Sequence, residues 1–549
     1  MPPSLAESIQ CFVNRRFAGS GSNQKAGSRP TLALSVLSGL AFLSLAIYCV
    51  LSSVAISAAG AKLLPNQTDN TYPESTNIYA AIQAAQTGHL YAVPSQPPYV
   101  LQPFGPLYYV INAAIARASH LNFELIRARA RLLTYGCFIL SAVIIFLICI
   151  RLRFSTVDSI LAALLFLGQP YFVTWNVTVR PDMLFLMVML LSLLCAVAGD
   201  SFGGAGYVLS GVLAGLAFLI KQPGIAVPIA VLMILLYRKK FRTAAVFTLS
   251  AVLPVVLVFS VLLWQRGPFL EQFTSVGKGI WSLREGAVFA ADRLSIMLVL
   301  VPVMIGVIGF AQAIRSEDTS SQTVAVFAIT NWVVGFSGLP QVGADVNYFL
   351  PGLAGCGLLL PFAIQMIRRH LYSKVYLAII VLTFSWMIRQ EVVILSRVFS
   401  DVLRPAERSY ISLEPFKILS DRPIFTVHGR DADLLDPFTA HEFELTGHWD
   451  PSPILAKIQR GDYDLIILAS GNWHVIGDFR GIAWFGPTLV NAMNENYRVL
   501  CSTLSSVALE PRVREVAITP EALGPALGQR CGVGLHGHSP DLRFPPNVR

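Results

Sequence analysis

Ionisable residues stand at the ends of several long apolar stretches of this chain. Asp69 and Glu74 follow the first stretch, Arg180 and Asp182 precede a later one, and Lys221 ends the run GVLAGLAFLI. Carboxylates can take a proton from an attacking group, and cations can stabilise an anionic leaving group. Because charged groups are costly next to lipid, these positions are candidates for a functional site.

Each candidate also has an ordinary interpretation. Arg180 and Asp182 are compatible with an ion pair at the edge of a span, and Lys221 with a side chain that reaches toward the lipid head groups. Tyr348, in the run DVNYFLP, is compatible with an interface anchor.

A basic run, Arg127, Arg129 and Arg131, lies shortly before the second long apolar stretch. These side chains either reach to head groups from the start of a helix or form an anion site. We favour the first interpretation.

The composition indicates an integral membrane protein. Residues of the AVILMFWYC set make up 54% of the chain, charged residues make up 13%, and mean hydropathy is +0.59. Soluble proteins carry about 25% charged residues. The net charge of +9 is modest, and its basic residues gather at span ends, which favours membrane anchoring and argues against a nucleic-acid partner.

The hydropathy pattern predicts a polytopic α-helical membrane protein of about eleven spans, because a span needs roughly 20 apolar residues. The predicted spans are 31–59, 131–150, 157–175, 183–199, 206–221, 224–237, 243–264, 294–313, 322–338, 348–367 and 375–395.

Basic residues set the expected orientation. They precede the first span within the N-terminal tail, 1–30, and they recur in alternate loops at Arg151, Arg238, Arg315 and Arg368. The positive-inside rule then places the N-terminus in the cytoplasm and, with an odd number of spans, the C-terminal region outside.

Two regions of the sequence differ from the spans. The outer loop 61–130 contains Gly105–Ala118, which is apolar but short, and we expect a helix lying in the outer interface with Tyr108 and Tyr109 as anchors. The region 396–531 reads as a soluble α/β domain, and the Gly- and Pro-rich end, 532–549, is expected to be disordered.

The expected elements of the α/β domain are short. Strands are predicted at 423–428, 462–470 and 496–504, and helices at 454–460 and 487–494. If this domain is exported, Cys501 and Cys531 have the option of forming a disulfide, which spacing alone does not decide.

Five short motifs occur in an order that resembles the GT-C superfamily of glycosyltransferases. The likeness is to bacterial relatives of protein O-mannosyltransferases and to the aminoarabinose transferases that act on lipid A, and it covers residues 30–395. The motifs are Ala80-Ala81 through Gly88 to Tyr91, Pro106–Tyr109, Arg180–Asp182, Gly215–Lys221 and Asn347–Pro351.

The resemblance implies an inverting glycosyltransferase that moves a sugar from a polyprenyl-phosphate donor to a lipid, glycan or protein acceptor at the outer face of the membrane. It implies an acidic base after the first span. Glu74 lies five residues before Tyr79 and Asp69 lies ten before it, whereas relatives place the acid closer. We favour Glu74 because it adjoins the amphipathic stretch, with Asp69 as the alternative.

The other roles also follow from the resemblance. Arg180, Lys221 and Arg131 would bind the donor phosphate. A divalent cation is an open alternative, since some relatives use a metal and the ligands are unknown. Pocket residues would be Asp182, Tyr79, Tyr108, Asn347 and Tyr348.

The resemblance also suggests a bacterial inner membrane. Two other functions remain open. A transporter or flippase of a lipid-linked glycan precursor would favour broken spans in paired halves, and no internal repeat is visible. A non-catalytic assembly or sensor protein would use the tail to bind partners.

Overall fold

The structure is a computed structural model. It describes residues 32–65, 69, 74–93, 99–169, 172–202, 204–275, 279–291, 300–341, 344–369, 416–421, 433–434, 437–469, 486–502 and 506–513.

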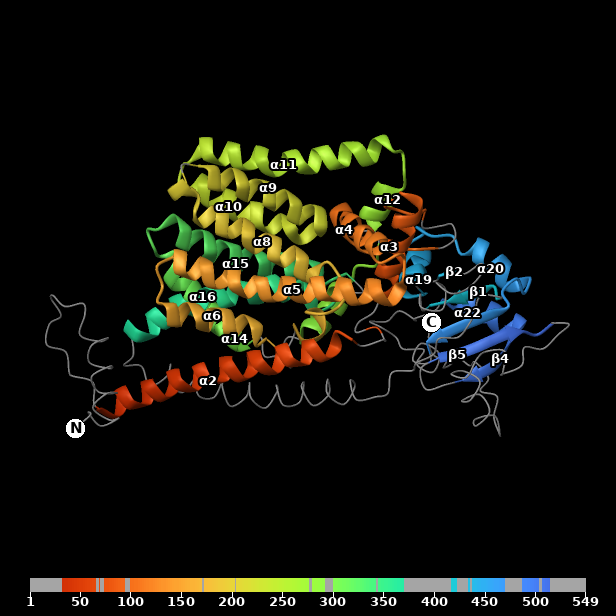
Figure 1. Ribbon diagram of the computed structural model, residues 1–549, viewed down its shortest axis with the longest axis horizontal. Helices are drawn as coiled ribbons and strands as arrows, with labels where there is room; N and C mark the ends of the chain where they lie inside the picture. The colour runs from red at the N-terminus through yellow and green to blue at the C-terminus, as the bar shows by residue number, and fades with distance from the viewer. Residues whose placement is uncertain are drawn as a thin grey trace.

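Apolar helices make up the larger part of the molecule (Figure 1). Their bounds are α2 Leu32–Leu63, α3 Glu74–Thr87, α4 Pro106–Ala118, α5 Phe123–Arg151, α6 Thr156–Leu167, α7 Phe172–Trp175, α8 Asp182–Val197, α9 Ala205–Ile220, α10 Ala226–Tyr237, α11 Phe241–Trp264, α12 Phe269–Phe273, α13 Leu283–Phe289, α14 Leu300–Ile314, α15 Thr319–Gly338 and α16 Leu350–Arg369. Helices occupy every predicted span within the described residues, and 375–395 lies outside them.

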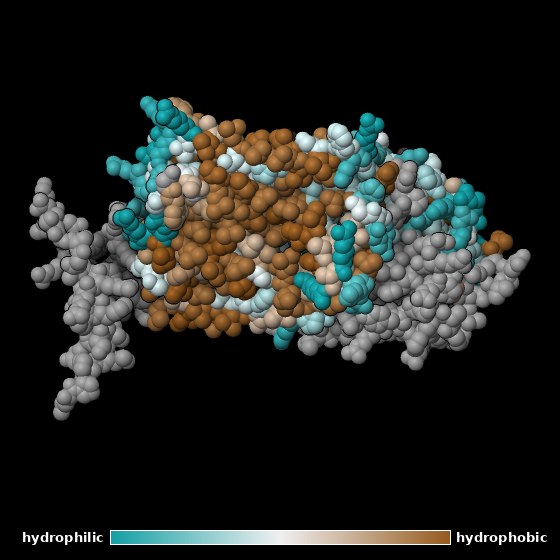
Figure 2. Space-filling model, turned by 45° about the horizontal axis from the view of Figure 1, so that its top comes forward, coloured by the Kyte–Doolittle hydropathy of each residue, from teal (hydrophilic) through white to brown (hydrophobic). Residues whose placement is uncertain are grey.

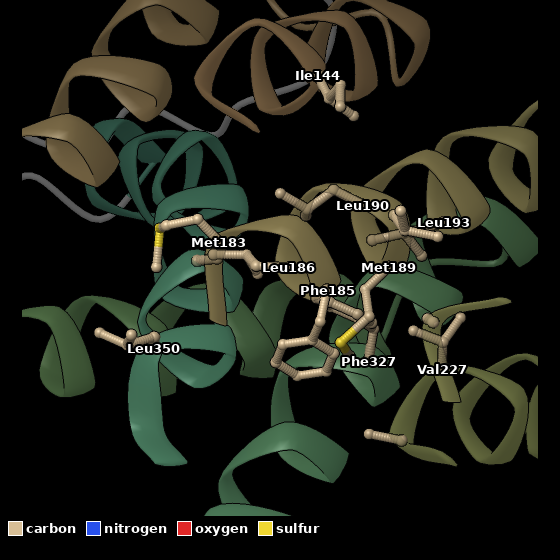
Figure 3. Packing of buried hydrophobic residues seen from close by; sticks show 14 of the residues in the cluster. Ile144, Met183, Phe185, Leu186, Met189, Leu190, Leu193, Val227, Phe327 and Leu350 are labelled. Atoms are coloured by element: carbon tan, nitrogen blue, oxygen red, sulfur yellow. The ribbon is translucent and has the colours of Figure 1, made fainter. Parts of the chain in front are cut away.

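Helix α8 lies at the centre of this bundle. It is apolar around its whole circumference and contacts α5, α9, α10 and α15, as expected of a helix that is enclosed on all sides. In Figure 3, Phe185 and Met189 of α8 lie beside Phe327 of α15. The start of α8, at Asp182, therefore belongs to a largely buried helix of the bundle.

Helix α11 lies at the edge of the bundle and leaves much apolar surface exposed, including Leu249, Leu253 and Leu257. It approaches α9 closely, since a Cβ on Gly215 would lie 2.3 Å from the Ala251 carbonyl oxygen. Small residues permit such close packing between membrane helices.

Four of the described helices are long and apolar enough to cross a membrane: Phe42–Leu63, Phe123–Arg151, Phe241–Trp264 and Val346–Met366. Shorter apolar helices pack among them. The apolar surface forms a band between polar ends (Figure 2). These features are those of an integral membrane protein.

One polar end collects the basic loops that the positive-inside rule assigns to the cytoplasm. Arg151 bonds to Ser201, and Lys240 Nζ lies 2.7 Å from Asp200 Oδ2. Arg238 Nε lies 3.0 Å from Gln322 Oε1.

The opposite end carries α3, α4, α12 and a five-stranded sheet (Figure 1). The strands are β1 Ile418–Ser420, β2 Asp433–Leu434, β3 Leu465–Ala469, β4 Tyr497–Ser502 and β5 Ser506–Pro511, in the order β2-β1-β3-β5-β4. β1 pairs in parallel with β2 and β3, and β5 pairs antiparallel with β3 and β4.

Helices α19 (Pro437–Leu445), α20 (Ser452–Gln459) and α22 (Pro487–Asn496) accompany the sheet. Their apolar side chains form one core with those of the strands. The sheet and these helices are called the α/β unit below. The strand predicted at 423–428, the residue Cys531 and the end 532–549 lie outside the described residues.

One expectation for the first loop was wrong. Helix α4 forms as predicted, but Tyr108 and Tyr109 are buried in the main core and are not interface anchors. Helix α2 continues to Leu63 and α5 begins at Phe123, so both helices extend into the stretch predicted as the loop 61–130.

Candidate active site

The Asp182 carboxylate gathers three of the predicted site residues around it. Oδ1 accepts hydrogen bonds from Lys221 Nζ at 2.6 Å and from Asn347 Nδ2 at 3.0 Å. Oδ2 accepts one from Arg180 Nε at 3.3 Å. Asp182 begins α8, and Arg180 lies in the segment before it. Lys221 follows the end of α9, and Asn347 lies in the turn before α16. The group Arg180, Asp182 and Lys221 is called the outer cluster below.

The outer cluster carries more positive than negative charge, because it contains two cations and one carboxylate. Asp182 is sealed, with its side chain 1% exposed, whereas that of Arg180 is 14% exposed. The Arg180 guanidinium lies 4.8 Å from the Trp175 ring centroid and 5.6 Å from that of Phe104. These aromatic faces orient the cation that is most open to an incoming anion.

Lys221 is placed by the close approach of α4 to α9. The Gly105 amide donates to the Ile220 carbonyl at 3.1 Å. A Cβ on Gly105 would lie 2.0 Å from the Leu219 carbonyl oxygen, so only glycine allows this approach. The Lys221 ammonium lies 5.3 Å from the ring centroid of Tyr348.

Glu74 and Arg131 form a second ion pair, called the sealed pair below. Arg131 Nε and Nη2 each donate to a Glu74 carboxylate oxygen at 2.7 Å, and both side chains are 0% exposed. Glu74 Oε1 also accepts the Val179 amide at 2.9 Å. The sealed pair therefore fixes the residue that immediately precedes Arg180.

Asp69 is the more open of the two candidate acids, with its side chain 34% exposed. It accepts hydrogen bonds from the Ser75 amide at 3.1 Å and from the Ser75 hydroxyl, and Arg127 Nη2 lies 3.7 Å away. Desolvation by its surroundings, followed by the charge of Glu74, raises the pKa of the Asp69 carboxyl despite Arg127 and Ser75.

Two of the three residues of the basic run have carboxylate partners. Arg131 is paired with Glu74, and Arg127 Nη1 lies 2.9 Å from Glu124 Oε2. Arg129 donates to the Ala118 carbonyl. Arg127 and Arg131 belong to a buried ionic network, because α5 begins two turns earlier than predicted and encloses them.

The remaining pocket candidates are Tyr108 and Tyr79. Tyr108 donates to the Val179 carbonyl at 3.1 Å, which fixes the same stretch of chain as the sealed pair. Tyr79 of α3 is buried, and burial raises the pKa of its hydroxyl to about 12. Its hydroxyl therefore stays protonated at neutral pH.

Sequence reasoning missed the residues that hold the first loop. Gln272 Oε1 accepts the Gln102 amide at 2.8 Å, and Gln272 Nε2 donates to the carbonyls of Ala92 and Val100. Neutral amides give no pattern that hydropathy or charge analysis detects. No group of three His, Cys, Asp or Glu in the described part of the chain is arranged to hold a metal ion.

Comparison with known proteins finds one family that matches part of the chain. Residues 113–264 match the family of dolichyl-phosphate-mannose-protein mannosyltransferases. This match covers α5 to α11 and includes Arg180, Asp182 and Lys221. No curated protein matches the sequence.

Solved structures of ArnT share the fold, and a further solved structure aligns less closely. ArnT from Cupriavidus metallidurans, bound to undecaprenyl phosphate or in the apo state, aligns with a TM-score of 0.55 and 14% identity, over 84% of this chain and 97% of that one. The oligosaccharyltransferase AglB from Archaeoglobus fulgidus, in complex with an inhibitory peptide and a dolichol-phosphate, aligns with a TM-score of 0.49 and 13% identity, over 86% and 76%.

The protein is thus an integral membrane protein with the fold of GT-C glycosyltransferases. The resemblance inferred from the ordered motifs is confirmed at this level.

Proposed function

We propose that this protein is an inverting glycosyltransferase that moves a sugar from a polyprenyl-phosphate donor to an acceptor at the outer face of the membrane. The observation that carries the proposal is the outer cluster, whose Arg180 and Lys221 meet at Asp182 beside the first loop. The mannosyltransferase family match and the ArnT fold, known with undecaprenyl phosphate, support the donor class.

The donor phosphate would be held by the net positive charge of the outer cluster. As the bond between the anomeric carbon and the phosphate oxygen breaks, negative charge grows on the phosphate, and preorganised cations in a partly dry site stabilise it. Asp182 holds the two cations at fixed positions and Asn347 holds Asp182.

We assign the general base to Asp69 in preference to Glu74. The Glu74 carboxylate is fully enclosed and engaged by Arg131 and the Val179 amide, whereas Asp69 is partly exposed and its pKa is raised. A raised pKa makes the ionised carboxylate a stronger base. Asp69 would accept the proton of the acceptor group as that group attacks the anomeric carbon.

We infer the outer location from the distribution of charge. The end of the molecule that carries the α/β unit lies opposite the loops of Arg151, Arg238 and Lys240. The positive-inside rule assigns these basic loops to the cytoplasm. The outer cluster and the α/β unit would then face the outside, in a bacterial inner membrane by analogy with ArnT.

The test is release of polyprenyl phosphate by purified protein from synthetic polyprenyl-phosphate sugars. Wild-type protein should release it, and Lys221→Met should lose most of the activity at a temperature at which the variant is still folded. A chelator series in the same assay decides whether a divalent cation takes part. Absence of release from every donor by folded wild-type protein would overturn the proposal and favour transport.

A further inference from the structure

Tyr99 of the first loop is inserted into the α/β unit. It is 3% exposed and shares a core with Leu419, Ile466 and Leu509 of the sheet. Its ring meets the Trp449 ring edge-to-face, with centroids 6.5 Å apart. The backbone of Tyr99 has φ 55°, a left-handed conformation that is unfavourable for a bulky residue. The packing of the ring must offset this strain.

The residues that follow Tyr99 pack against the helical bundle and not against the α/β unit. Val100 and Phe104 belong to the main core of the helical bundle. Between them, the Gln102 side chain donates from Nε2 to the Leu90 carbonyl at 2.7 Å. The Gln102 backbone amide donates to Oε1 of Gln272 in α12. Residues 99–105, called the bridging segment below, therefore join the α/β unit to the bundle.

The far end of the bridging segment reaches the outer cluster. The Phe104 ring faces Arg180, and the Gly105 amide bonds to Ile220, the neighbour of Lys221. Gln222, on the other side of Lys221, donates to the Pro103 carbonyl at 2.7 Å. The bridging segment thus contacts Arg180 directly, and it bonds to the residues on both sides of Lys221.

A second contact connects the same two parts of the molecule. Glu442 of α19 accepts the Ile280 amide at 2.7 Å, in the loop that follows α12. Helix α12 carries Gln272. The α/β unit therefore reaches the bridging segment directly at Tyr99, and it also contacts the loop adjoining the helix that holds Gln102.

We propose that the bridging segment couples the α/β unit to the outer cluster, and that Tyr99 and Gln272 are positioning residues for donor recognition. The inference rests on the proposed function. A shift of the α/β unit moves Tyr99, the tightly bonded segment transmits the movement, and Arg180 and Lys221 lose their alignment on the phosphate. A partner or acceptor that binds the α/β unit would change donor affinity by the same route.

The first test compares Tyr99→Ala with two controls in the polyprenyl-phosphate release assay. Tyr99→Ala should raise the KM for the donor about tenfold, within the usual range of coupling between sites, with kcat little changed. Tyr99→Phe keeps the ring and should restore the KM. Met493→Ala truncates the same core from α22, and should lower the unfolding temperature without raising the KM.

A double-mutant cycle separates coupling from general damage. If Tyr99 acts through Arg180, Tyr99→Ala should have a much smaller effect on donor KM in an Arg180→Ala background. Gln272→Ala should behave like Tyr99→Ala in both backgrounds. Direct binding of polyprenyl phosphate without the sugar should show the same order of affinities.

The outcomes distinguish the two proposals. Equal KM values for wild type and Tyr99→Ala, or equal KM increases in Tyr99→Ala and Met493→Ala, would overturn the coupling while leaving the glycosyltransferase in place. Fully additive effects with Arg180→Ala would also overturn it. If wild-type protein releases no polyprenyl phosphate, the proposed function fails first.

Discussion

The sealed pair and the outer cluster are both ionic groups at one end of the molecule, but they differ in what they leave available. Glu74 and Arg131 are 0% exposed, and their charges cancel in a bidentate contact. Arg180, Asp182 and Lys221 combine two cations with one carboxylate, and part of Arg180 reaches the surface. A fully enclosed bidentate pair is suited to holding the fold, and a partly open group with two cations is suited to binding an anion.

The two groups are also connected. Val179 bonds to Glu74 through its amide and to Tyr108 and Asn77 through its carbonyl, and Arg180 follows it in the chain. The comparison teaches that burial, more than residue type, separates the ions that hold the fold from the ions proposed to bind the donor.

The largest expected effect is that of Asp69→Asn, which removes the proposed base. General-base catalysis contributes about 10²- to 10⁴-fold, so kcat should fall by that factor. Donor KM and the unfolding temperature should stay close to wild type, since the amide oxygen of the substituted side chain can still accept from Ser75. Near-normal kcat in this variant would move the base elsewhere.

Glu74→Gln should act on the fold. It leaves the buried Arg131 guanidinium without its counter-charge, and such a loss costs about 3–5 kcal/mol of unfolding free energy. Chemical denaturation in detergent measures it. The double variant Glu74→Leu with Arg131→Met should be less destabilised than Glu74→Gln.

Glu74→Gln also tests whether the sealed pair has only a structural role. If Glu74→Gln unfolds like wild type but is inactive, Glu74 is the base, as the sequence alone favoured.

Lys221→Met should lower kcat by about 10²- to 10³-fold, equivalent to about 2.7–4 kcal/mol of transition-state stabilisation. The release assay measures it. Lys240→Met is the matched control, because Lys240 pairs with Asp200 at the opposite end, and an exposed pair contributes little. Equal activity of the two variants would contradict a phosphate role for Lys221.

Trp175→Phe should have a smaller effect. It keeps an aromatic face under Arg180 but weakens the cation–π contact, by about 0.5–1 kcal/mol at a partly exposed site. Donor KM should rise about two- to fivefold with kcat retained, as steady-state kinetics would show. A fall in kcat with normal KM would place Arg180 in the chemical step alone.

The pH profile should show the smallest shift. The base must be ionised, so kcat/KM rises with pH through the pKa of Asp69 and then levels off. Because that pKa is raised, the acidic limb should lie above the ordinary value of about 3.9. The residual activity of Asp69→Asn should lack this limb, and an unchanged limb there would assign it to another group.

Much of the fold was predictable from hydropathy, because a membrane imposes long apolar helices on any chain that crosses it. The α4 helix and the helices at 452–459 and 487–496 also form near their predicted positions. The depth of Tyr108 and Tyr109 was not predictable, since it depends on packing against α9 and α5.

The sequence by itself determined the membrane class, the order of the motifs and the candidate charges of the site. Only the tertiary structure decided which of those charges are enclosed. It joined Arg131 to Glu74 across 57 residues and Asn347 to Asp182 across 165. The physical reason is that the cost of an ion and its pairing depend on what surrounds it in space, and neighbours distant in the chain leave no signal in local composition or spacing.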